Sequence, residues 1–470
     1  MRQVPERFDV AILGGGMGGY PAAIRAAQLG LRTALVEEDK VGGTCLHRGC
    51  IPTKALLQSA ALLDQLQHAK EFGVNAELTG FDYAVAGKRR DQVVGQLFRG
   101  VEYLLKKNKV TVVRGRGRLG GAGRLAVTAA TGDPVEVEAD HVIIASGSRP
   151  KQLPGVAADG SQVLTSDDAL FRNAIPKSAV VLGAGAVGVE FASFYRSCGV
   201  EVTLVEALPS LVPLEDADVG KELRRQFEAR GITCLVGSKL NLDSVERNEG
   251  GVAMTVTDAD GKEQRLQAEV LLVAVGRAAN VEDIGLEGTR VGVKDGVIVT
   301  DSYGSTGEPN VSAIGDVAGG FQLAHKALHQ GVICVEQIAG RNPEPLDPQH
   351  VTRTTYCTPQ IGSLGLSEAE AKAAGHEVVT GTFPFRGNGR ALIWGEAGGF
   401  CKVVADSQTK DVLGVHIIGH EVTELIWGPA LGALLETTPY EMGRAVAPHP
   451  TLSEAISEAA LALNGEAIHI

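Results

Sequence analysis

Short apolar runs separated by clusters of glycine dominate the hydrophobic pattern of the chain. Residues 10–13 form an apolar run of the kind that becomes a buried parallel strand. An alanine-rich helical stretch follows at 20–29, and Gly30 is placed to end it. A second apolar run at 31–36 leads to Glu37. This order predicts a strand, a helix and a second strand at the start of an α/β fold.

Three glycines stand between the first predicted strand and the helix. Gly14, Gly16 and Gly19 form the pattern G-x-G-x-x-G. In such a unit the first glycine makes the turn, the second lets the backbone approach a pyrophosphate, and the third lets helix and strand pack closely. The helix N-terminus offers N–H groups to the phosphates, and Glu37 can accept hydrogen bonds from ribose hydroxyls. Because all these parts agree, the pattern predicts a dinucleotide site and not a chance glycine turn.

The same unit recurs further along the chain. Strands are predicted at 179–182 and 202–205. Between them stand the glycines Gly183, Gly185 and Gly188. In both copies 23 positions separate the first glycine from the acid, Gly14 from Glu37 and Gly183 from Glu206. The repeat therefore predicts two dinucleotide sites in one chain.

The acid of the second copy indicates which nicotinamide coenzyme is used. A carboxylate at this position bonds the free 2′-hydroxyl of NAD and repels the 2′-phosphate of NADP. Glu206 is followed by Ala207, Leu208 and Pro209, without the Arg or Lys typical of an NADP site. We therefore expect NAD.

Size and charge narrow the class of protein. A chain of 470 residues exceeds the roughly 250–300 residues at which single cores divide, so several domains are expected. The net charge of −12 argues against nucleic acid and anionic membranes as partners. No apolar stretch is long enough and free enough of glycine and charge to span a membrane, and no apolar leader follows the first residues. We expect a cytoplasmic protein.

Two of the seven cysteines, Cys45 and Cys50, lie close together just after the first dinucleotide unit. They could form a redox dithiol, a metal site with His47 as third ligand, or two unrelated buried thiols. The metal site is disfavoured because no further Cys/His cluster has zinc spacing, and no metal is expected. A dithiol beside an electron-carrying cofactor has an electron acceptor within reach. On one helical turn, disulfide geometry would require a local distortion, which Gly49 and Pro52 are suited to supply.

The segment G-G-T-C-L-H-R-G-C-I-P-T-K resembles the redox-active disulfide motif of the class I flavoprotein disulfide reductases, and above all of the dihydrolipoamide dehydrogenases. Further resemblances cover nearly the whole chain, at residues 145–148, 275–277, 313–316, 322–325, 383–385 and 449–454. The resemblance implies two Rossmann-like domains, with FAD in the first and NAD in the second, and an α+β dimerisation domain. The expected division is 1–150 for the first part of the FAD domain, 151–275 for the NAD domain, 276–346 for the second FAD part, and 347–470 for the interface domain.

The same resemblance assigns roles to individual residues. It implies that Cys45 exchanges with substrate, that Cys50 faces the flavin, and that His449 is the base, oriented by Glu454. An imidazole pKa near 6.5 suits proton transfer near neutral pH. Two structural alternatives stay open, because residues 451–454 also match a capping box and His449 could be an ordinary loop histidine. In the family this pair reaches the cysteines of the other subunit, which implies a homodimer.

The resemblance also implies a set of cofactor contacts. For FAD the residues are Gly14, Gly16, Gly19, Glu37, Gly43, Thr44, Lys54, Gly117, Ser146, Gly147, Asp316, Gln322, Leu323, Ala324 and His325. For NAD they are Gly183, Gly185, Val187, Gly188, Glu190, Glu206 and Gly276. Lys54 and Glu190 are expected to form an ion pair near the flavin.

The expected activity is NAD-dependent oxidation of dihydrolipoamide, carried on the lipoyl domain of the E2 component of a 2-oxoacid dehydrogenase complex. The alternative is a flavoenzyme that reduces another low-molecular-weight disulfide with NAD(P)H. A purely structural subunit is disfavoured because the cysteine pair, the base and both glycine patterns are intact. A C-terminal redox pair, as in mercuric reductases and large thioredoxin reductases, is missing.

Overall fold

The computed structural model describes residues 7–121, 123–129 and 134–470. The first six residues, on which the expectation of no leader partly rests, lie outside this description. The chain divides into two units. Unit 1 comprises residues 1–55, 85–151 and 277–346, and unit 2 comprises 56–84, 152–276 and 347–470. The predicted four-part division is finer than these two units and stays a prediction.

Unit 1 is built on a seven-stranded sheet with the order β3-β2-β1-β6-β5-β4, and β19 pairs with β6. The strands are β1 (Arg7–Leu13), β2 (Thr33–Glu37), β3 (Thr111–Arg114), β4 (Arg116–Leu119), β5 (Arg124–Thr128), β6 (Val135–Ile144) and β19 (Val311–Ala313). β1, β2, β3, β6 and β19 pair in parallel, as buried apolar strands joined by helices do. Strands that are far apart in the sequence thus share one sheet.

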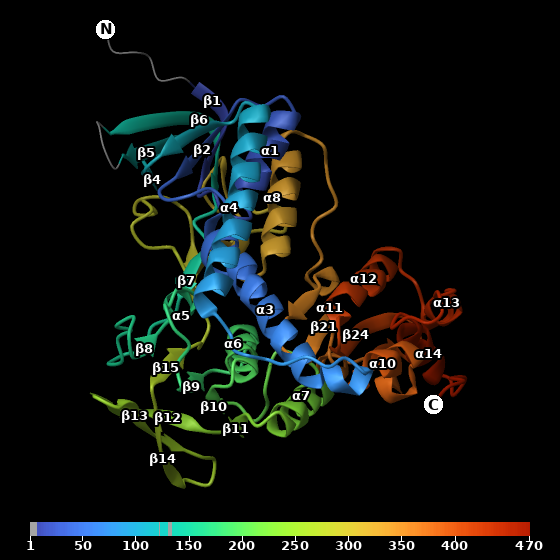
Figure 1. Ribbon diagram of the computed structural model, residues 1–470. Coiled ribbons are helices and arrows are strands. Elements are labelled where there is room, and N and C mark those ends of the chain that lie inside the picture. Colours follow the sequence, from blue (N-terminus) through green and yellow to red (C-terminus); the bar gives the residue numbers. More distant parts are fainter. Residues whose placement is uncertain (1–6, 122, 130–133) are drawn as a thin grey trace. The chain divides into compact units, whose positions relative to one another are not determined.

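Three helices pack together in unit 1, namely α1 (Gly19–Gln28), α4 (Tyr83–Lys107) and α8 (Ala324–Ile338), which run side by side in Figure 1. Ala22, Leu105 and Val335 of these helices share one buried core with Val10 and Ile12 of β1. The helix α3 (Cys50–His68) begins in unit 1 and continues into unit 2. Short elements complete unit 1: α2 (Gly43–Arg48), β7 (Ser148–Pro150), β16 (Arg277–Ala279), β17 (Val293–Lys294), β18 (Val297–Ile298) and the 3-10 turn Gly315–Ala318.

Unit 2 contains a second parallel sheet, with the order β11-β10-β9-β15-β8. Its strands are β8 (Val163–Leu164), β9 (Ser178–Leu182), β10 (Glu201–Val205), β11 (Thr233–Leu235) and β15 (Val270–Val273). The helices here are α5 (Ser166–Leu170), α6 (Ala186–Ser197) and α7 (Ala217–Ala229), and an antiparallel sheet is formed by β12 (Lys239–Asn248), β13 (Gly251–Thr257) and β14 (Glu263–Ala268). The strand, helix and strand predicted at each glycine pattern are present in both units, with ends shifted by one to three residues.

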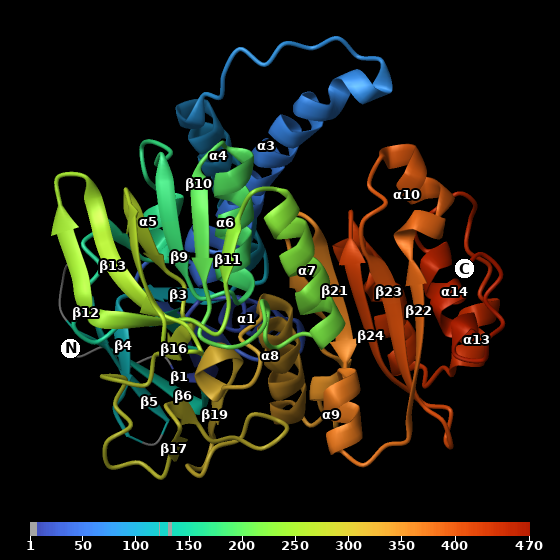
Figure 2. The same ribbon diagram turned by 90° about the horizontal axis from the view of Figure 1, so that it is seen from below.

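The C-terminal part of unit 2 is an antiparallel sheet in the order β20-β21-β24-β23-β22, whose orange strands are neighbours in Figure 2. The strands are β20 (Arg353–Thr355), β21 (Gln360–Gly365), β22 (Val378–Pro384), β23 (Phe400–Asp406) and β24 (Val412–Gly419). The helices are α9 (Glu368–Ala373), α10 (Gly389–Trp394), α11 (Val422–Leu425), α12 (Trp427–Leu434), α13 (Pro439–Arg444) and α14 (Glu454–Ala462), and α14 packs on β22 and β23. The 3-10 turns of unit 2 are Ala69–Phe72, Pro348–His350 and Phe385–Gly387. The predicted α/β class with an α+β C-terminal domain is confirmed.

None of the described helices combines the length and apolarity needed to cross a lipid bilayer.

A buried lysine joins the nucleotide-binding and C-terminal parts of unit 2. Lys402 on β23 is only 3% exposed, and its Nζ donates to Asp216 at 3.0 Å, Asp218 at 2.7 Å and Glu368 at 2.9 Å. Burial lowers the pKa of Lys402, but the three carboxylates outweigh burial and raise it. Asp216 is also the N-cap residue of α7, and its Oδ1 accepts the backbone N–H of Asp218. The cluster therefore connects α7, α9 and β23.

Replacing Lys402 by Met should destabilise the folded chain by about 3–5 kcal/mol, because the buried carboxylate of Asp216 would be left without a cation. The measurement is the melting temperature of the Lys402→Met variant. Lys372→Met is the matched control, since Lys372 bonds the same Glu368 from an exposed position and such helix pairs contribute only about 0.3–0.5 kcal/mol. Equal melting temperatures for both variants would contradict this role of Lys402.

The difference between Lys402→Met and the native chain should shrink in acid. Lys372 and Lys402 lower the pKa of Glu368. Burial acts to raise the pKa of Asp216, but hydrogen bonds from the Glu368 N–H and Lys402 outweigh it and lower that pKa. Carboxyl groups with lowered folded-state pKa values stabilise the fold above their ordinary range of about 4, and this stabilisation is lost as the pH falls.

Candidate functional site

The first glycine pattern forms a tight turn between β1 and α1. Gly14 has a φ of +104°, and a Cβ there would lie 2.3 Å from the carbonyl oxygen of Ala145. A Cβ on Gly19 would lie 1.8 Å from the carbonyl oxygen of Gly14. A Cβ on Gly16, in contrast, would have no neighbour nearer than 3.9 Å. The turn and the close packing predicted for the first and third glycines are therefore present. Space remains at the second glycine, where a pyrophosphate contact is predicted.

The second glycine pattern repeats this geometry between β9 and α6. Gly183 has a φ of +98°, with a Cβ position 2.5 Å from the carbonyl oxygen of Ala274. A Cβ on Gly188 would lie 1.8 Å from the carbonyl oxygen of Gly183, and nothing lies within 4 Å of the Cβ position of Gly185. Gly185 is also the N-cap residue of α6. Both units thus place an open glycine beside the N-terminus of a helix, the arrangement that suits a phosphate.

Glu37 and Glu206, the acids that end the two glycine units, each accept a backbone hydrogen bond from their own glycine turn. Glu37 accepts the Gly15 N–H through Oε2 at 2.7 Å and the Asp39 N–H through Oε1 at 2.8 Å. Glu206 accepts the Ala184 N–H through Oε2 at 2.7 Å and a second backbone N–H, two residues on, at 2.8 Å. A carboxylate oxygen has two lone pairs, so each acid keeps acceptor capacity for a ribose. The pattern alone gave no sign of this structural role.

The cysteine pair spans a break between two helices. Cys45 lies in α2, which ends at Arg48, and Cys50 begins α3. Between them Gly49 leaves the helical conformation, with φ −141° and ψ −111°. Pro52 lies in the first turn of α3, where a missing N–H costs nothing. The two cysteines therefore do not share one helical turn, and the break at Gly49 supplies the expected distortion.

The electrostatic surroundings keep Cys45 protonated. A hydrogen bond with the Cys50 thiol is the largest cause that raises the pKa of Cys45, and burial adds to it. The ammonium of Lys54 acts in the opposite direction. Burial first, and then the nearby Cys45, raise the pKa of Tyr20. Thiol exchange at this pair therefore needs a base, because a thiol reacts as its thiolate.

The residues between the cysteines are bound to other partners. His47 lies with Nε2 2.9 Å from the carbonyl oxygen of Val41 and packs edge-on against Phe98. Arg48 forms an ion pair with Asp39. These contacts fasten the redox helix α2 to the loop that follows β2, so His47 and Arg48 are structural at this position.

Several predicted FAD contacts come together in unit 1. A Cβ on Gly43 would lie 2.6 Å from the Gly16 Cα, so the backbone before Thr44 abuts the first glycine turn. Ser146 and Gly147 directly follow Ala145, the neighbour of Gly14. The segment Gln322–His325 enters α8, with Leu323 as N-cap residue and Ala324 and His325 in the first turn.

Other predicted cofactor contacts have structural neighbours. The Cβ position of Gly117 meets the core side chains Leu13 and Val36. Val187 lies in the first turn of α6, and Gly276 has a φ of +101°. Buried Glu190 accepts the Tyr356 N–H at 3.0 Å. The ion pair predicted between Glu190 and Lys54 would join the two units and stays a prediction.

Asp316 occupies the 3-10 turn after β19 and accepts a hydrogen bond from the Ser148 hydroxyl through Oδ2. Ser148 belongs to the predicted flavin segment, so the two motifs meet in unit 1.

His449 and Glu454 form a dyad at the start of α14. His449 Nδ1 lies 2.7 Å from Glu454 Oε1, and Glu454 Oε2 accepts the Thr451 N–H at 2.8 Å. Burial acts to raise the pKa of Glu454, but the bonds from His449 and Thr451 outweigh it and lower that pKa. The Thr451 hydroxyl donates to the Pro448 carbonyl, so only the Glu half of the capping box is present. Glu454 thus binds the backbone N–H of Thr451 and also orients His449. The His449 side chain is 78% exposed.

A second His–Glu pair on the same helix had no signal in the sequence. Glu458 lies one turn after Glu454 on α14, and its Oε1 lies 2.8 Å from His469 Nδ1. Glu458 Oε2 accepts the backbone N–H groups of Ile468 and His469. This pair fastens the last residues of the chain to α14.

The five remaining cysteines are buried or partly buried. Burial raises the pKa of Cys198, Cys234 and Cys401 to about 12 and that of Cys334 to about 11. Cys357 is buried, with Sγ 3.0 Å from the Pro359 carbonyl. Such thiols stay protonated and inert at neutral pH.

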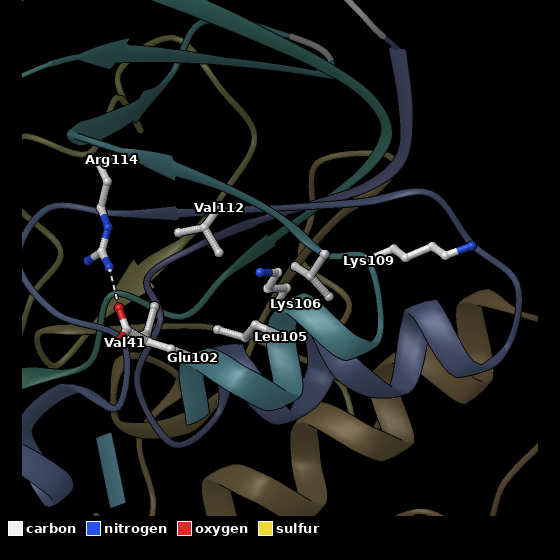
Figure 3. A pocket seen from close by; sticks show the side chains of 8 residues that line it. Val41, Glu102, Leu105, Lys106, Lys109, Val112 and Arg114 are labelled. Carbon is white, nitrogen blue, oxygen red and sulfur yellow. Dashed lines mark hydrogen bonds and ion pairs between the residues drawn. The ribbon is translucent and has the colours of Figure 1, made fainter. Parts of the chain in front are cut away.

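A surface hollow of about 410 Å³ lies on unit 1, between the last turns of α4 and β3 (Figure 3). Its lining includes Val41, Lys106, Lys109 and Arg114, and Arg114 pairs with Glu102 across it at 3.5 Å. None of the predicted catalytic or cofactor-binding residues lines this hollow.

Comparison with protein families finds two matches that together cover most of the chain. Residues 8–331 match the model described as pyridine nucleotide-disulphide oxidoreductase. Residues 351–460 match the dimerisation domain of pyridine nucleotide-disulphide oxidoreductases.

Curated relatives and solved structures resemble the chain over its length. Dihydrolipoyl dehydrogenase of Bacillus subtilis (strain 168) is 46% identical, covering 98% of this chain and 99% of the relative. Dihydrolipoyl dehydrogenase of Rhizobium etli is 44% identical, covering 99% of each. The crystal structure of LpdA from Mycobacterium tuberculosis has a TM-score of 0.88 at 29% identity, covering 97% of this chain and 99% of that chain. The Escherichia coli flavoprotein disulfide reductase RclA, at 24% identity and a TM-score of 0.85 over 97% and 99%, shares the fold.

Alanine at the third glycine should separate the two nucleotide sites. Overpacking of this kind costs about 1–3 kcal/mol, so Gly188→Ala should raise the NAD dissociation constant roughly tenfold while FAD content is retained. Gly19→Ala should instead lower the FAD content. Flavin absorbance and NAD titration measure the two effects. Gly100→Ala in α4 is the neutral control, because nothing lies within 4 Å of the Cβ position of Gly100. Loss of FAD in the Gly188 variant would contradict the assignment.

Proposed function

The chain belongs to the pyridine nucleotide-disulphide oxidoreductase family, and from this membership we propose that it is a dihydrolipoyl dehydrogenase with FAD and NAD as cofactors. It oxidises dihydrolipoamide to lipoamide and reduces NAD. The observation that carries this proposal is the position of the cysteine pair shortly after Gly43, whose backbone contacts the first glycine turn at Gly16. The second glycine pattern of the chain is followed by the acid Glu206. Relatives named dihydrolipoyl dehydrogenase, 43–46% identical over nearly the full length, support it.

The residues of both turns fit dinucleotides. The open Cβ positions at Gly16 and Gly185 leave the space that a pyrophosphate needs, and Glu37 and Glu206 retain acceptor capacity for a ribose. Asp316 would hold the ribityl chain of FAD, and the N-terminus of α8 would offer positive dipole charge to the flavin ring. When bound, FAD takes up the electron pair of the dithiol and delivers it to NAD as hydride.

Cys45 and Cys50 carry out the disulfide exchange. One substrate thiolate attacks the Cys45 sulfur of the Cys45–Cys50 disulfide, and Cys50 leaves as a thiolate. The second substrate thiolate attacks the substrate sulfur of this mixed disulfide, so the product disulfide is released and Cys45 leaves as a thiolate. The charge of Lys54, which acts against the causes that raise the pKa of Cys45, helps to stabilise the Cys45 thiolate.

His449 is the base that removes the substrate protons. Its Nδ1 is held by Glu454 at 2.7 Å, which leaves Nε2 for the substrate thiol. The exposed carboxylate–imidazole pair favours the protonated imidazole that forms after proton transfer. Neutral thiols are poor nucleophiles, so this step sets the pH dependence of exchange.

The family match to a dimerisation domain supports a homodimer. Trp427, Leu431 and Leu434 share one face of α12 and are exposed, as suits an interface. In the proposed dimer, His449 and Glu454 of one subunit serve the cysteine pair of the other. The substrate is the lipoyl group of the E2 component of a 2-oxoacid dehydrogenase complex, and the proposed location is the cytoplasm.

Purified protein loaded with FAD should form NADH rapidly from dihydrolipoamide and NAD, and only slowly form NADPH from NADP. The physical reason is repulsion between Glu206 and the 2′-phosphate of NADP. Absorbance at the reduced-nicotinamide band measures both rates. A chain that binds FAD and reduces a different disulfide with NADH, without acting on dihydrolipoamide, would instead be a reductase of that disulfide.

Replacing His449 by Gln should lower turnover about 10²–10⁴-fold, the usual contribution of a general base. Flavin content and the NADH-dependent reduction of the flavin should remain, because the base acts only on thiol exchange. Stopped-flow absorbance separates the two half-reactions. His469→Gln is the matched control, since His469 is also paired with a Glu of α14. Equal losses of turnover in both variants would mean that His449 has no special role.

A further inference from the structure

The chain leaves unit 1 after β7 and re-enters it at β16, and these two strands pair as an antiparallel ribbon. Arg277 is opposite Pro150, and Ala279 is opposite Ser148. β7 is labelled in Figure 1 and β16 in Figure 2. The first residue after the inserted segment is thus Arg277, at the end of this ribbon.

Arg277 binds Ser148, and Ser148 also contacts Asp316, the carboxylate that is predicted to bind the flavin. Its Nε donates to the Ser148 hydroxyl at 2.7 Å, and its Nη2 donates to the Ser148 carbonyl at 2.7 Å. The Ser148 hydroxyl in turn donates to Asp316 Oδ2. Ser148 is buried, so little water competes for these bonds.

We infer that Arg277 is a positioning residue for the flavin site, acting through Ser148 on Asp316. The ribbon at which the chain re-enters unit 1 thereby sets the position of the carboxylate that holds the ribityl chain. This inference rests on the proposed function, because it requires that Asp316 binds FAD.

The direction of the hydrogen bonds leaves no choice of arrangement. A guanidinium only donates, so Arg277 occupies a lone pair of the Ser148 oxygen. The single hydroxyl proton of Ser148 then points at Asp316, which accepts it as a carboxylate. Bonds to charged groups at both ends are the stronger kind, and linked bonds polarise one another. The contact uses only Oδ2, so Oδ1 is available to a ribityl hydroxyl.

A second cation near this site is Lys326. Lys326 lies in the first turn of α8, is buried, and donates through Nζ to the Gly319 carbonyl. Burial lowers the pKa of Lys326, and Asp316 acts to raise it, which shows that the two charges sense each other. Asp316 is therefore compensated from α8 as well as through Ser148.

The ribbon also contains bonds that do not reach Asp316. Arg149 of β7 donates to both carboxylate oxygens of Glu282 at 2.9 Å. Ser146 and Asn280 exchange two hydrogen bonds of 2.8 Å. Arg149 therefore provides a matched control, because it is an arginine on the same ribbon whose side chain donates to Ala279, Asn280 and Glu282 and not to the Ser148 hydroxyl.

The test compares FAD binding to the apoproteins of Arg277→Met, Ser148→Ala, the double variant and Arg149→Met. A hydrogen bond to a charged group contributes enough that its loss raises a dissociation constant roughly tenfold or more. We expect this rise in Arg277→Met and in Ser148→Ala, and no larger rise in the double variant, because Arg277 acts through Ser148. Arg149→Met should bind FAD like the native chain. Arg277→Lys should fall between native and Arg277→Met, because an ammonium keeps the charge but lacks the two-pronged geometry.

Fluorescence quenching of the flavin gives the dissociation constants, and circular dichroism of each apoprotein verifies folding. Equal FAD affinity in Arg277→Met and Arg149→Met would overturn the inference. Losses that add fully in the double variant would overturn it as well, because Arg277 would then act independently of Ser148. A native chain that binds no FAD would instead refute the proposed function itself. A native chain that binds FAD but does not oxidise dihydrolipoamide would refute only the substrate, and the comparison of variants would remain valid.

Discussion

Two backbone contacts, one in each unit, determine where the reactive groups lie. In each glycine turn the third glycine faces the carbonyl oxygen of the first so closely that a Cβ would be only 1.8 Å away. This contact holds the first turn of a helix at the end of a central strand and leaves its N–H groups free for phosphate. In unit 1 the redox loop is then placed by a second contact without side chains, between Gly43 and Gly16. Cys45 then follows in the short helix α2, and Cys50 begins α3.

Local spacing predicted the parts of the structure that depend on neighbours in sequence. The two glycine turns and the cysteine pair each lie within one short segment, so their residue types and spacing carry the signal. The bond between His449 and Glu454 was implied only by the family resemblance. Contacts between distant segments carried none. The buried Lys402 looks like any strand lysine until Asp216 and Glu368 arrive from elsewhere in the chain. The break at Gly49 was anticipated only as a distortion, because two helices and one bent helix have the same local sequence preferences.

The proposed chemistry is divided between groups with opposite electrostatic needs. The hydrogen bond with the Cys50 thiol, and then burial, raise the pKa of Cys45. The carboxylate that orients His449 has a lowered pKa and stays charged. The proposed base, His449, belongs to unit 2, whereas the proposed redox cysteines belong to unit 1.

Glu206 is proposed to bind the coenzyme ribose and also binds the backbone of its own turn. This double role affects how coenzyme preference can be changed by design. Glu206 supplies acceptors to two backbone N–H groups of its own turn. A basic residue at this position, as an NADP-specific enzyme would favour, removes both acceptors at once and loosens the turn that carries the phosphates. A switch of coenzyme therefore requires new partners for these N–H groups in addition to a new charge. A single substitution of Glu206 by a basic residue is therefore expected to weaken the site for either coenzyme.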